Sequence, residues 1–166
     1  MRRFVAPLFF VLLGASALFI IGTSEALPER VASHFARGGE ANGWMPRETY
    51  VAFILIAALG VPLALVALLA WLPRAFPNAV NLPNRAYWFA TERREATLAS
   101  FSSFAWVFGS LLAALMAGVH WAILRANAGT PPRFPESAFW ALLIGFGSIL
   151  AIWLAAWYLR FRRPSQ

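Results

Sequence analysis

Four long uncharged stretches dominate the pattern of apolar and polar positions along the chain. Each holds roughly 20 residues, the length that a helix needs to cross about 30 Å of hydrocarbon. A helix is expected in each because a single segment in lipid must satisfy its backbone polar groups internally. The pattern predicts an all-α polytopic membrane protein with one four-helix domain over residues 1–166, whose spans are about 4–22, 50–72, 98–124 and 138–159.

Composition supports lipid as the surrounding medium. Hydrophobic residues make up 60% of the 166 residues, and the mean hydropathy is +0.63. A water-soluble domain of this length could not bury so much apolar surface. The chain has no cysteine, which excludes disulfides and thiolate metal sites. We therefore expect the lipid bilayer as the main partner.

The charge of the chain is strongly positive but does not indicate nucleic-acid binding. The net charge is +7, and every basic residue is arginine while every acidic residue is glutamate. These arginines flank the apolar stretches, where they set membrane orientation and contact anionic headgroups. No nucleic-acid partner is expected.

The first apolar stretch has a second interpretation as a signal peptide. Ala15-Ser16-Ala17 resembles a cleavage site with small residues. The apolar sequence continues beyond it through Leu18-Phe19-Ile20-Ile21, however, and is longer than a secretory signal needs. We therefore interpret this stretch as a span.

The distribution of arginines predicts the orientation. With the N-terminus inside, nine arginines fall on the inner side and five on the outer side. The inner set is Arg2, Arg3, Arg74, Arg85, Arg93, Arg94, Arg160, Arg162 and Arg163, and the outer set is Arg30, Arg37, Arg47, Arg125 and Arg133. The positive-inside bias then places both termini inside.

Two features of the spans predict how the helices pack. Pro62 lies within the second span and should kink it. Small residues recur at every fourth position in the third and fourth spans, which allows close helix contact but also arises by chance in alanine-rich helices. The sets are Gly109, Ala113 and Ala117; Ser110, Ala114 and Gly118; and Gly147, Ala151 and Ala155.

The polar loop between the first two spans, residues 23–48, predicts an ordered cap on the outer membrane face. Pro28 suits the first turn of a short helix, on which Leu27, Val31 and Phe35 would share an apolar side. Gly38-Gly39 would end that helix. Asn42-Gly43 is a turn signal, and Trp44 would anchor the cap at the interface.

These loop residues resemble the signature of the family called domain of unknown function 1648. The matching features are a proline, a His-Phe pair six residues later, a glycine, and a turn with an aromatic residue; here they are Pro28, His34, Phe35, Gly39, Asn42, Gly43 and Trp44. The resemblance covers about residues 4–72, and the small polar residue usual after His-Phe is replaced by Ala36. It implies a bacterial membrane protein. Similar units form the N-terminal part of Sdp-type immunity proteins, which protect against a secreted peptide toxin and can signal to a repressor.

Candidate chemistry centres on the two histidines. The predicted orientation places His34 and His120 on the outer side, together with Glu25. Imidazole and carboxylate groups could bind zinc or copper or relay a proton. The chain has no HExxH motif and no close pair of ligands, so such a site requires the fold to join distant residues. In the alternative interpretation, each histidine serves its local structure and Glu25 caps the next helix.

These patterns favour a non-enzymatic interaction protein of immunity, sensing or accessory type. No catalytic, cofactor or metal site is expected, and the bacterial plasma membrane is the expected location. The expected mechanism is binding of a peptide or protein at the cap, sensed through helix packing around Pro62. Two alternatives stay open: a membrane enzyme or a metal or proton site using the outer histidines and glutamates, and a structural subunit that leaves small-residue stripes uncovered.

Overall fold

The computed structural model describes residues 2–162, with side chains from Phe4 onward. Arg163, which the arginine count includes, lies outside the described residues. Four helical segments in the described part are long and apolar enough to cross a membrane: Phe4–Ala26, Arg47–Ala75, Thr91–Asn127 and Glu136–Phe161. They contain the four predicted spans. The length and composition of these helices are those of a multi-pass membrane protein.

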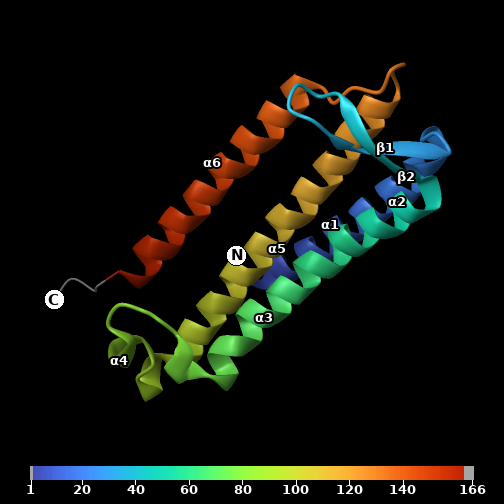
Figure 1. Ribbon diagram of the computed structural model, residues 1–166. Coiled ribbons are helices and arrows are strands. Elements are labelled where there is room, and N and C mark those ends of the chain that lie inside the picture. The colour runs from blue at the N-terminus through green and yellow to red at the C-terminus, as the bar shows by residue number, and fades with distance from the viewer. Residues whose placement is uncertain (1, 163–166) are drawn as a thin grey trace.

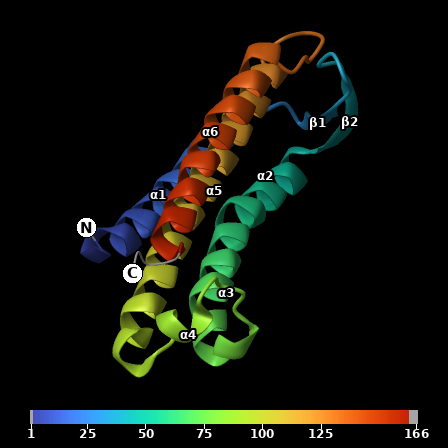
Figure 2. The ribbon, with the colours of Figure 1, turned by 90° about the vertical axis from the view of Figure 1, so that its left-hand side faces the viewer.

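The helices alternate in direction and are joined by short connections (Figure 1). The elements are α1 (Arg2–Thr23), the 3-10 turn η1 (Ser24–Ala26), β1 (Arg30–Phe35), β2 (Ala41–Pro46), α2 (Arg47–Leu55), η2 (Ile56–Gly60), α3 (Val61–Ala75), the 3-10 turn η3 (Pro77–Ala79), α4 (Arg85–Trp88), α5 (Thr91–Asn127) and α6 (Glu136–Phe161). We call the end with β1, β2 and residues 128–135 the hairpin end, and the opposite end the α4 end. The start of α1 and the end of α6 lie away from the hairpin (Figure 2).

A two-stranded antiparallel sheet makes the all-α prediction wrong in one place. Residues 30–35 and 41–46 pair as β1 and β2, where the sequence suggested a short helix beginning at Pro28. Gly38 and Gly39 have φ angles of +107° and +85° and form the reversal between the strands. Paired glycines with positive φ connect hairpin strands as readily as they end helices. Asn42-Gly43, predicted to be a turn, instead lies within β2.

The second span bends through a π-helical segment. η2 is a π-helix of five residues, and it directly precedes Pro62 at the start of α3. Proline has no N–H to donate to the carbonyl four residues earlier, which is that of Ala58. Widening the helix at this point accommodates the missing bond and the proline ring. Pro62 and Ala58 are both buried, so the irregular segment faces the other helices.

The central helix is α5, which packs against α1, α3 and α6. It packs tightly on α3 and α1 at Gly109, where an added Cβ would lie 2.3 Å from Cγ2 of Val66 and 2.8 Å from Cε2 of Phe9. Gly109 and Ala113 are buried, which confirms this predicted small-residue stripe as a helix contact. The stripe Gly147, Ala151 and Ala155 on α6 is exposed.

Candidate functional site

The side chain of Asn127 binds the hairpin to the end of α5. Oδ1 of Asn127 accepts a hydrogen bond from the Ala32 N–H at 2.8 Å, and Nδ2 donates to the Ala32 C=O at 3.0 Å. Nδ2 also donates to the Ile123 C=O at 2.9 Å, which fixes the amide on its own helix. Asn127 thus binds β1 as a neighbouring strand would, and it closes that edge of the hairpin.

The hairpin tip is tied to the connection between α5 and α6. The guanidinium of Arg133 donates to the Gly38 C=O from Nε at 3.2 Å and from Nη2 at 3.1 Å. The Phe134 N–H donates to the Gly39 C=O at 2.7 Å, and the rings of Phe35 and Phe134 lie 5.3 Å apart. The tip is therefore fixed by residues far away in the sequence.

Gly39 has two structural requirements. Its positive φ disfavours a side chain, and an added Cβ would lie 2.6 Å from the Phe134 carbonyl oxygen. This glycine of the predicted cap therefore permits the contact between the hairpin tip and the loop before α6.

The other predicted cap residues organise the irregular pairing of the two strands. Nδ1 of His34 donates to Oδ1 of Asn42 at 2.5 Å, since an amide oxygen can only accept. His34 pairs with Gly43 at a β-bulge, and a Cβ on Gly43 would lie 2.9 Å from the His34 Cβ. His34 and Asn42 are exposed. Pro28 lies in the exposed link between η1 and β1.

Glu25 lies at the base of the hairpin, where its carboxylate pairs with an arginine and not with a histidine. Its carboxylate is 3.7 Å from Nη1 of Arg47, which also donates to the Leu27 C=O at 3.2 Å. The Glu25 side chain is 89% exposed, so solvent screens the pair and its contribution to stability is small. The Arg47 N–H donates to the Glu29 C=O and continues the strand pairing into α2.

The inner side of the hairpin is part of the apolar core. Leu27 and Val31 are buried in a cluster with residues of α1, α2, η2 and α5, namely Ile20, Tyr50, Ile54, Ala58 and Ile123. The predicted grouping of Leu27 and Val31 on an apolar side is thus confirmed, although the side belongs to a strand and its approach. Burial of this face couples the hairpin to the spans below it.

The outer side of the hairpin carries Trp44 and an unpaired strand edge. In an antiparallel ladder, every second pair directs its N–H and C=O groups outward. Ala32 pairs with Trp44, and Asn127 binds both outward groups of Ala32, so the N–H and C=O of Trp44 point to the opposite edge. Outside the ladder of β1 and β2, neither group has a hydrogen-bond partner among the described residues. The Trp44 side chain is 48% exposed.

His120 is fully buried beneath the hairpin and belongs to a separate hydrogen-bond network. The Thr23 hydroxyl donates to the Phe19 C=O at 2.7 Å, so its oxygen accepts from Nε2 of His120 at 2.9 Å. The Tyr50 hydroxyl then donates to the unprotonated Nδ1 at 3.0 Å. Both ring nitrogens of His120 are occupied, and the network joins α1, α2 and α5. This arrangement serves helix association in lipid.

No hydrogen bond or ion pair joins Glu25, His34 and His120 to one another in the described part of the chain. Glu25 contacts Arg47, His34 contacts Asn42, and His120 contacts Thr23 and Tyr50. In residues 2–162, no three histidine or carboxylate side chains are grouped so that they could hold a metal ion. With both nitrogens used, His120 has no lone pair left to offer a metal.

Four residues that hold this region together were not among the site residues predicted from the sequence: Thr23, Tyr50, Asn127 and Arg133. Asn127 ends a long apolar helix, and an isolated amide at a span end is a signal that could have been followed. Thr23 and Tyr50 lie at span ends too, where polar groups are common. Their convergence on His120 depends on helix packing, which the sequence does not give.

A family model matches part of the first 60 residues. Residues 10–60 match the family model described as Domain of unknown function (DUF1648). We call residues 10–60 the DUF1648 unit. This unit extends from within α1 through the hairpin to Gly60, the last residue of η2. No curated protein and no solved structure matches the chain.

The DUF1648 unit is completed by residues outside it. Its hairpin is bound by Asn127 and Arg133, and its buried tyrosine, Tyr50, is bound by His120. These three partners belong to α5 and to the loop after it. The DUF1648 unit and the second half of the chain therefore fold together.

Proposed function

We propose that this protein is a non-enzymatic binding protein of a bacterial plasma membrane, with the hairpin as its extracytoplasmic binding element. Its partner is a peptide or protein segment that adds to the β2 edge in an extended conformation. The proposal is supported most directly by the unequal edges of the hairpin: Asn127 closes β1, and the Trp44 peptide groups on β2 point outward unpaired.

Strand addition is a common way for a sheet edge to bind a peptide. Backbone hydrogen bonds supply affinity, and side chains beside the edge supply specificity. Trp44 provides a large, half-exposed aromatic surface at the same position. Pro46, the next outward residue of β2, lacks an N–H, which limits the edge to a short segment and protects it against aggregation.

The proposed orientation places the hairpin outside and α4 inside. The α4 end of the described chain holds six arginines, and α1 also begins there, at Arg2. The six are Arg74, Arg85, Arg93, Arg94, Arg160 and Arg162. Five arginines belong to the hairpin end. The positive-inside bias supports an inner α4 end and both termini inside.

The proposed signal passes from the hairpin into the membrane through packed contacts. Val31 packs in the same buried cluster as Ala58, which lies in the π-helical segment before Pro62. A π-helical turn is a site at which a helix can readily change register or bend. A shift of the hairpin on partner binding would therefore alter the packing of α3 against α5.

Immunity against a secreted peptide toxin is the specific role suggested by resemblance to Sdp-type proteins. The DUF1648 match supports the shared unit, and the proposed strand-binding edge suits a peptide. Sensing and accessory roles share the same binding step. All three versions of the proposal can therefore be tested at the hairpin edge.

The test is cross-linking of a secreted peptide encoded by a neighbouring gene. A photoreactive amino acid replaces exposed Glu48, just after β2, and in the control it replaces exposed Glu136 at the start of α6. We expect the peptide to cross-link from position 48 and not from position 136. Growth of cells with and without the chain during exposure to the peptide tests the immunity version.

Two substitutions then separate the strand edge from the indole ring. Trp44→Ala removes the ring and keeps the outward N–H, whereas Trp44→Pro removes both. We expect cross-linking from position 48 to weaken in Trp44→Ala and to disappear in Trp44→Pro. Equal cross-linking in the parent protein and Trp44→Pro, or equal cross-linking from positions 48 and 136, would contradict the proposal.

A structural subunit is the second candidate, and the exposed small-residue stripe on α6 favours it. Gly147, Ala151 and Ala155 have no covering helix among the described residues, as expected for a surface that another helix completes. Disulfide cross-linking of Ala151→Cys in membranes tests this candidate. A cross-linked product with Ala151→Cys and none with Phe139→Cys, at an exposed position on another side of α6, would support it.

A further inference from the structure

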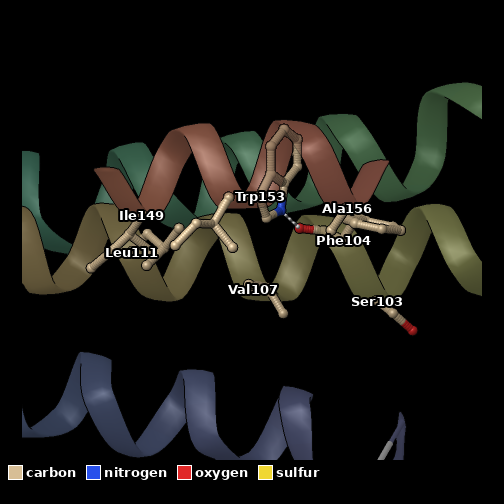
Figure 3. Close-up of a pocket in the computed structure, with 8 residues that line it drawn as sticks. Ser103, Phe104, Val107, Leu111, Ile149, Trp153 and Ala156 are labelled. Carbon is tan, nitrogen blue, oxygen red and sulfur yellow. Dashed lines mark hydrogen bonds between the residues drawn. The ribbon is translucent and has the colours of Figure 1, made fainter. Parts of the chain in front are cut away.

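An apolar groove separates the middle parts of α5 and α6 (Figure 3). Its volume is about 340 Å³. The wall from α5 is formed by Ser103, Phe104, Val107 and Leu111, and the wall from α6 by Ile149, Ile152, Trp153 and Ala156. The polar groups of this lining are already bonded: the Trp153 indole N–H donates to the Phe104 C=O at 3.1 Å, and the Ser103 hydroxyl donates to the Ala99 C=O at 2.9 Å.

Close contacts between α6 and α5 lie on either side of the groove. At the α4 end, Phe161 and Trp157 pack on Phe101 and Phe104 of α5. At the hairpin end, Leu142 contacts α5 at Gly118, where an added Cβ would lie 2.6 Å from the leucine Cδ2. α6 has no comparable contact with α1 or α3 in the described chain, so the groove opens toward lipid.

A positive charge lies at the α4 end of this groove. Arg160 follows Ala156 by one helical turn, and Ser100 precedes Phe104 by one turn on the same face of α5. Nη2 of Arg160 donates to Oγ of Ser100 at 3.1 Å. The guanidinium carbon also lies 4.9 Å from the centre of the Trp88 ring. The pair Arg160–Ser100 therefore marks the end of the groove at the membrane surface.

This charge has no carboxylate partner among the described residues. Arg160 is half-buried, and its five N–H donors exceed the one hydrogen bond that it makes. The indole N–H of Trp88, the ring beneath the guanidinium, is buried and also lacks an acceptor in the described part. A half-buried guanidinium beside unused donors suits an anion, and phosphate matches its planar geometry.

The length of the groove matches one leaflet of a bilayer. Arg160 and Ile149 are eleven residues apart on α6, which corresponds to about 16 Å at 1.5 Å per residue. Half of a hydrocarbon core roughly 30 Å thick is about 15 Å. A chain that enters at Arg160 would therefore reach the bilayer midplane at the far end of the groove.

We propose that the groove is a binding site for one anionic phospholipid of the leaflet at the α4 end. One acyl chain lies between α5 and α6, and Arg160 binds the phosphate. The exposed stripe of small residues on α6 is centred about 150° around the helix from the groove, at 3.6 residues per turn. A bound lipid would leave that stripe free.

Native mass spectrometry of the detergent-purified chain tests the site, with phosphatidylglycerol and phosphatidylcholine as probes. We expect one bound phosphatidylglycerol, retained more strongly than phosphatidylcholine. Arg160→Gln should reduce the preference about fivefold, the effect of one basic residue at a membrane surface. Arg162→Gln, an exposed arginine two residues away, should leave it unchanged.

A second experiment tests the groove by filling it with a larger side chain. Val107→Phe places a ring in the groove and should abolish retention of both lipids. Leu154→Phe changes an exposed side chain outside the groove, so this variant should retain lipid as the parent protein does. In the parent protein, a phosphatidylglycerol with a photoreactive acyl chain should label residues 103–111 and 149–156. This labelling requires no variant and is independent of any folding defect.

Three outcomes would overturn the proposal. Equal losses in Arg160→Gln and Arg162→Gln would indicate diffuse attraction of anionic lipid to the surface. Retention of lipid by folded Val107→Phe would place the lipid elsewhere. A dimer that Val107→Phe disrupts would show that a second copy occupies the groove.

Discussion

Asn127, the last residue of α5, binds both peptide groups of Ala32 in β1, although 95 residues separate them in the chain. Ala32 is fully buried, so its N–H and C=O would lack partners without this amide. The contact connects the third span to the hairpin and decides which strand edge is left open.

Asn127→Leu should release the hairpin from α5. The two hydrogen bonds to Ala32 are lost and its two buried peptide groups are left unpaired, which costs about 1–3 kcal/mol of local stability. Hydrogen exchange of residues 30–35 in lipid nanodiscs should become faster. Arg125→Gln, an exposed change on the same helix end, is the control and should exchange like the parent protein. Unchanged exchange in Asn127→Leu would contradict the role assigned to this amide.

Gly109→Val should destabilise the bundle. A Cβ there would overlap Val66 and Phe9, so α5 must move away from α1 and α3. Overpacking of this kind costs about 1–3 kcal/mol. Gly147→Val is the matched control, because no atom lies within 4 Å of a Cβ at that helical glycine. Unfolding in mixed micelles should separate the two variants; equal stabilities would refute close packing at Gly109.

Tyr50→Phe should weaken the network around His120. The change removes the hydroxyl that donates to Nδ1 and leaves that buried nitrogen without a donor. Interhelical hydrogen bonds in membranes average about 0.6 kcal/mol and reach about 1.7 kcal/mol, so the loss should be modest. Tyr158→Phe, at a side chain that is 66% exposed, should have no effect.

The same network predicts the tautomer of His120. In the parent protein, nitrogen NMR should show the proton on Nε2, which donates to Thr23. A proton on Nδ1 would reverse the donor chain described above and would be inconsistent with the Tyr50 hydroxyl as the donor.

Gly39→Ala should disturb the hairpin tip more than Gly38→Ala. Both glycines have positive φ, so alanine is strained at either position by about 1–2 kcal/mol. Only at Gly39 would the new Cβ approach a backbone atom, the Phe134 oxygen at 2.6 Å. Exchange of the Phe134 N–H, which donates to Gly39, reports the difference. Equal exchange in the two variants would count against this tight contact.

Labelling from the two sides of the membrane tests the proposed topology. The chain has no cysteine, so Asn42→Cys and Asn84→Cys each provide one thiol. An impermeant maleimide added to intact cells should label position 42 and leave position 84 unlabelled until the membrane is opened. Labelling of both positions from outside would exclude four alternating spans.

The spans were predictable because their cause is local. Length and uninterrupted apolarity suffice to favour a membrane helix, and the predicted range 50–72 lies within the observed Arg47–Ala75. The proline at position 62 likewise indicated an irregular helix, and the π-helical segment directly before it confirms the irregularity. The loop signature around His34 and Phe35 identified the DUF1648 unit.

The sequence by itself determined which segments enter lipid, since burial in hydrocarbon depends on the composition of each segment alone. Only the tertiary structure decided what the residues between them do. Val31 and Phe35 fit an apolar side of either a helix or a strand, and the strand form prevails because Asn127 and residues 133–134 supply its missing partners. Likewise, His120 gains its role from Thr23 and Tyr50, which only helix packing brings within hydrogen-bond distance.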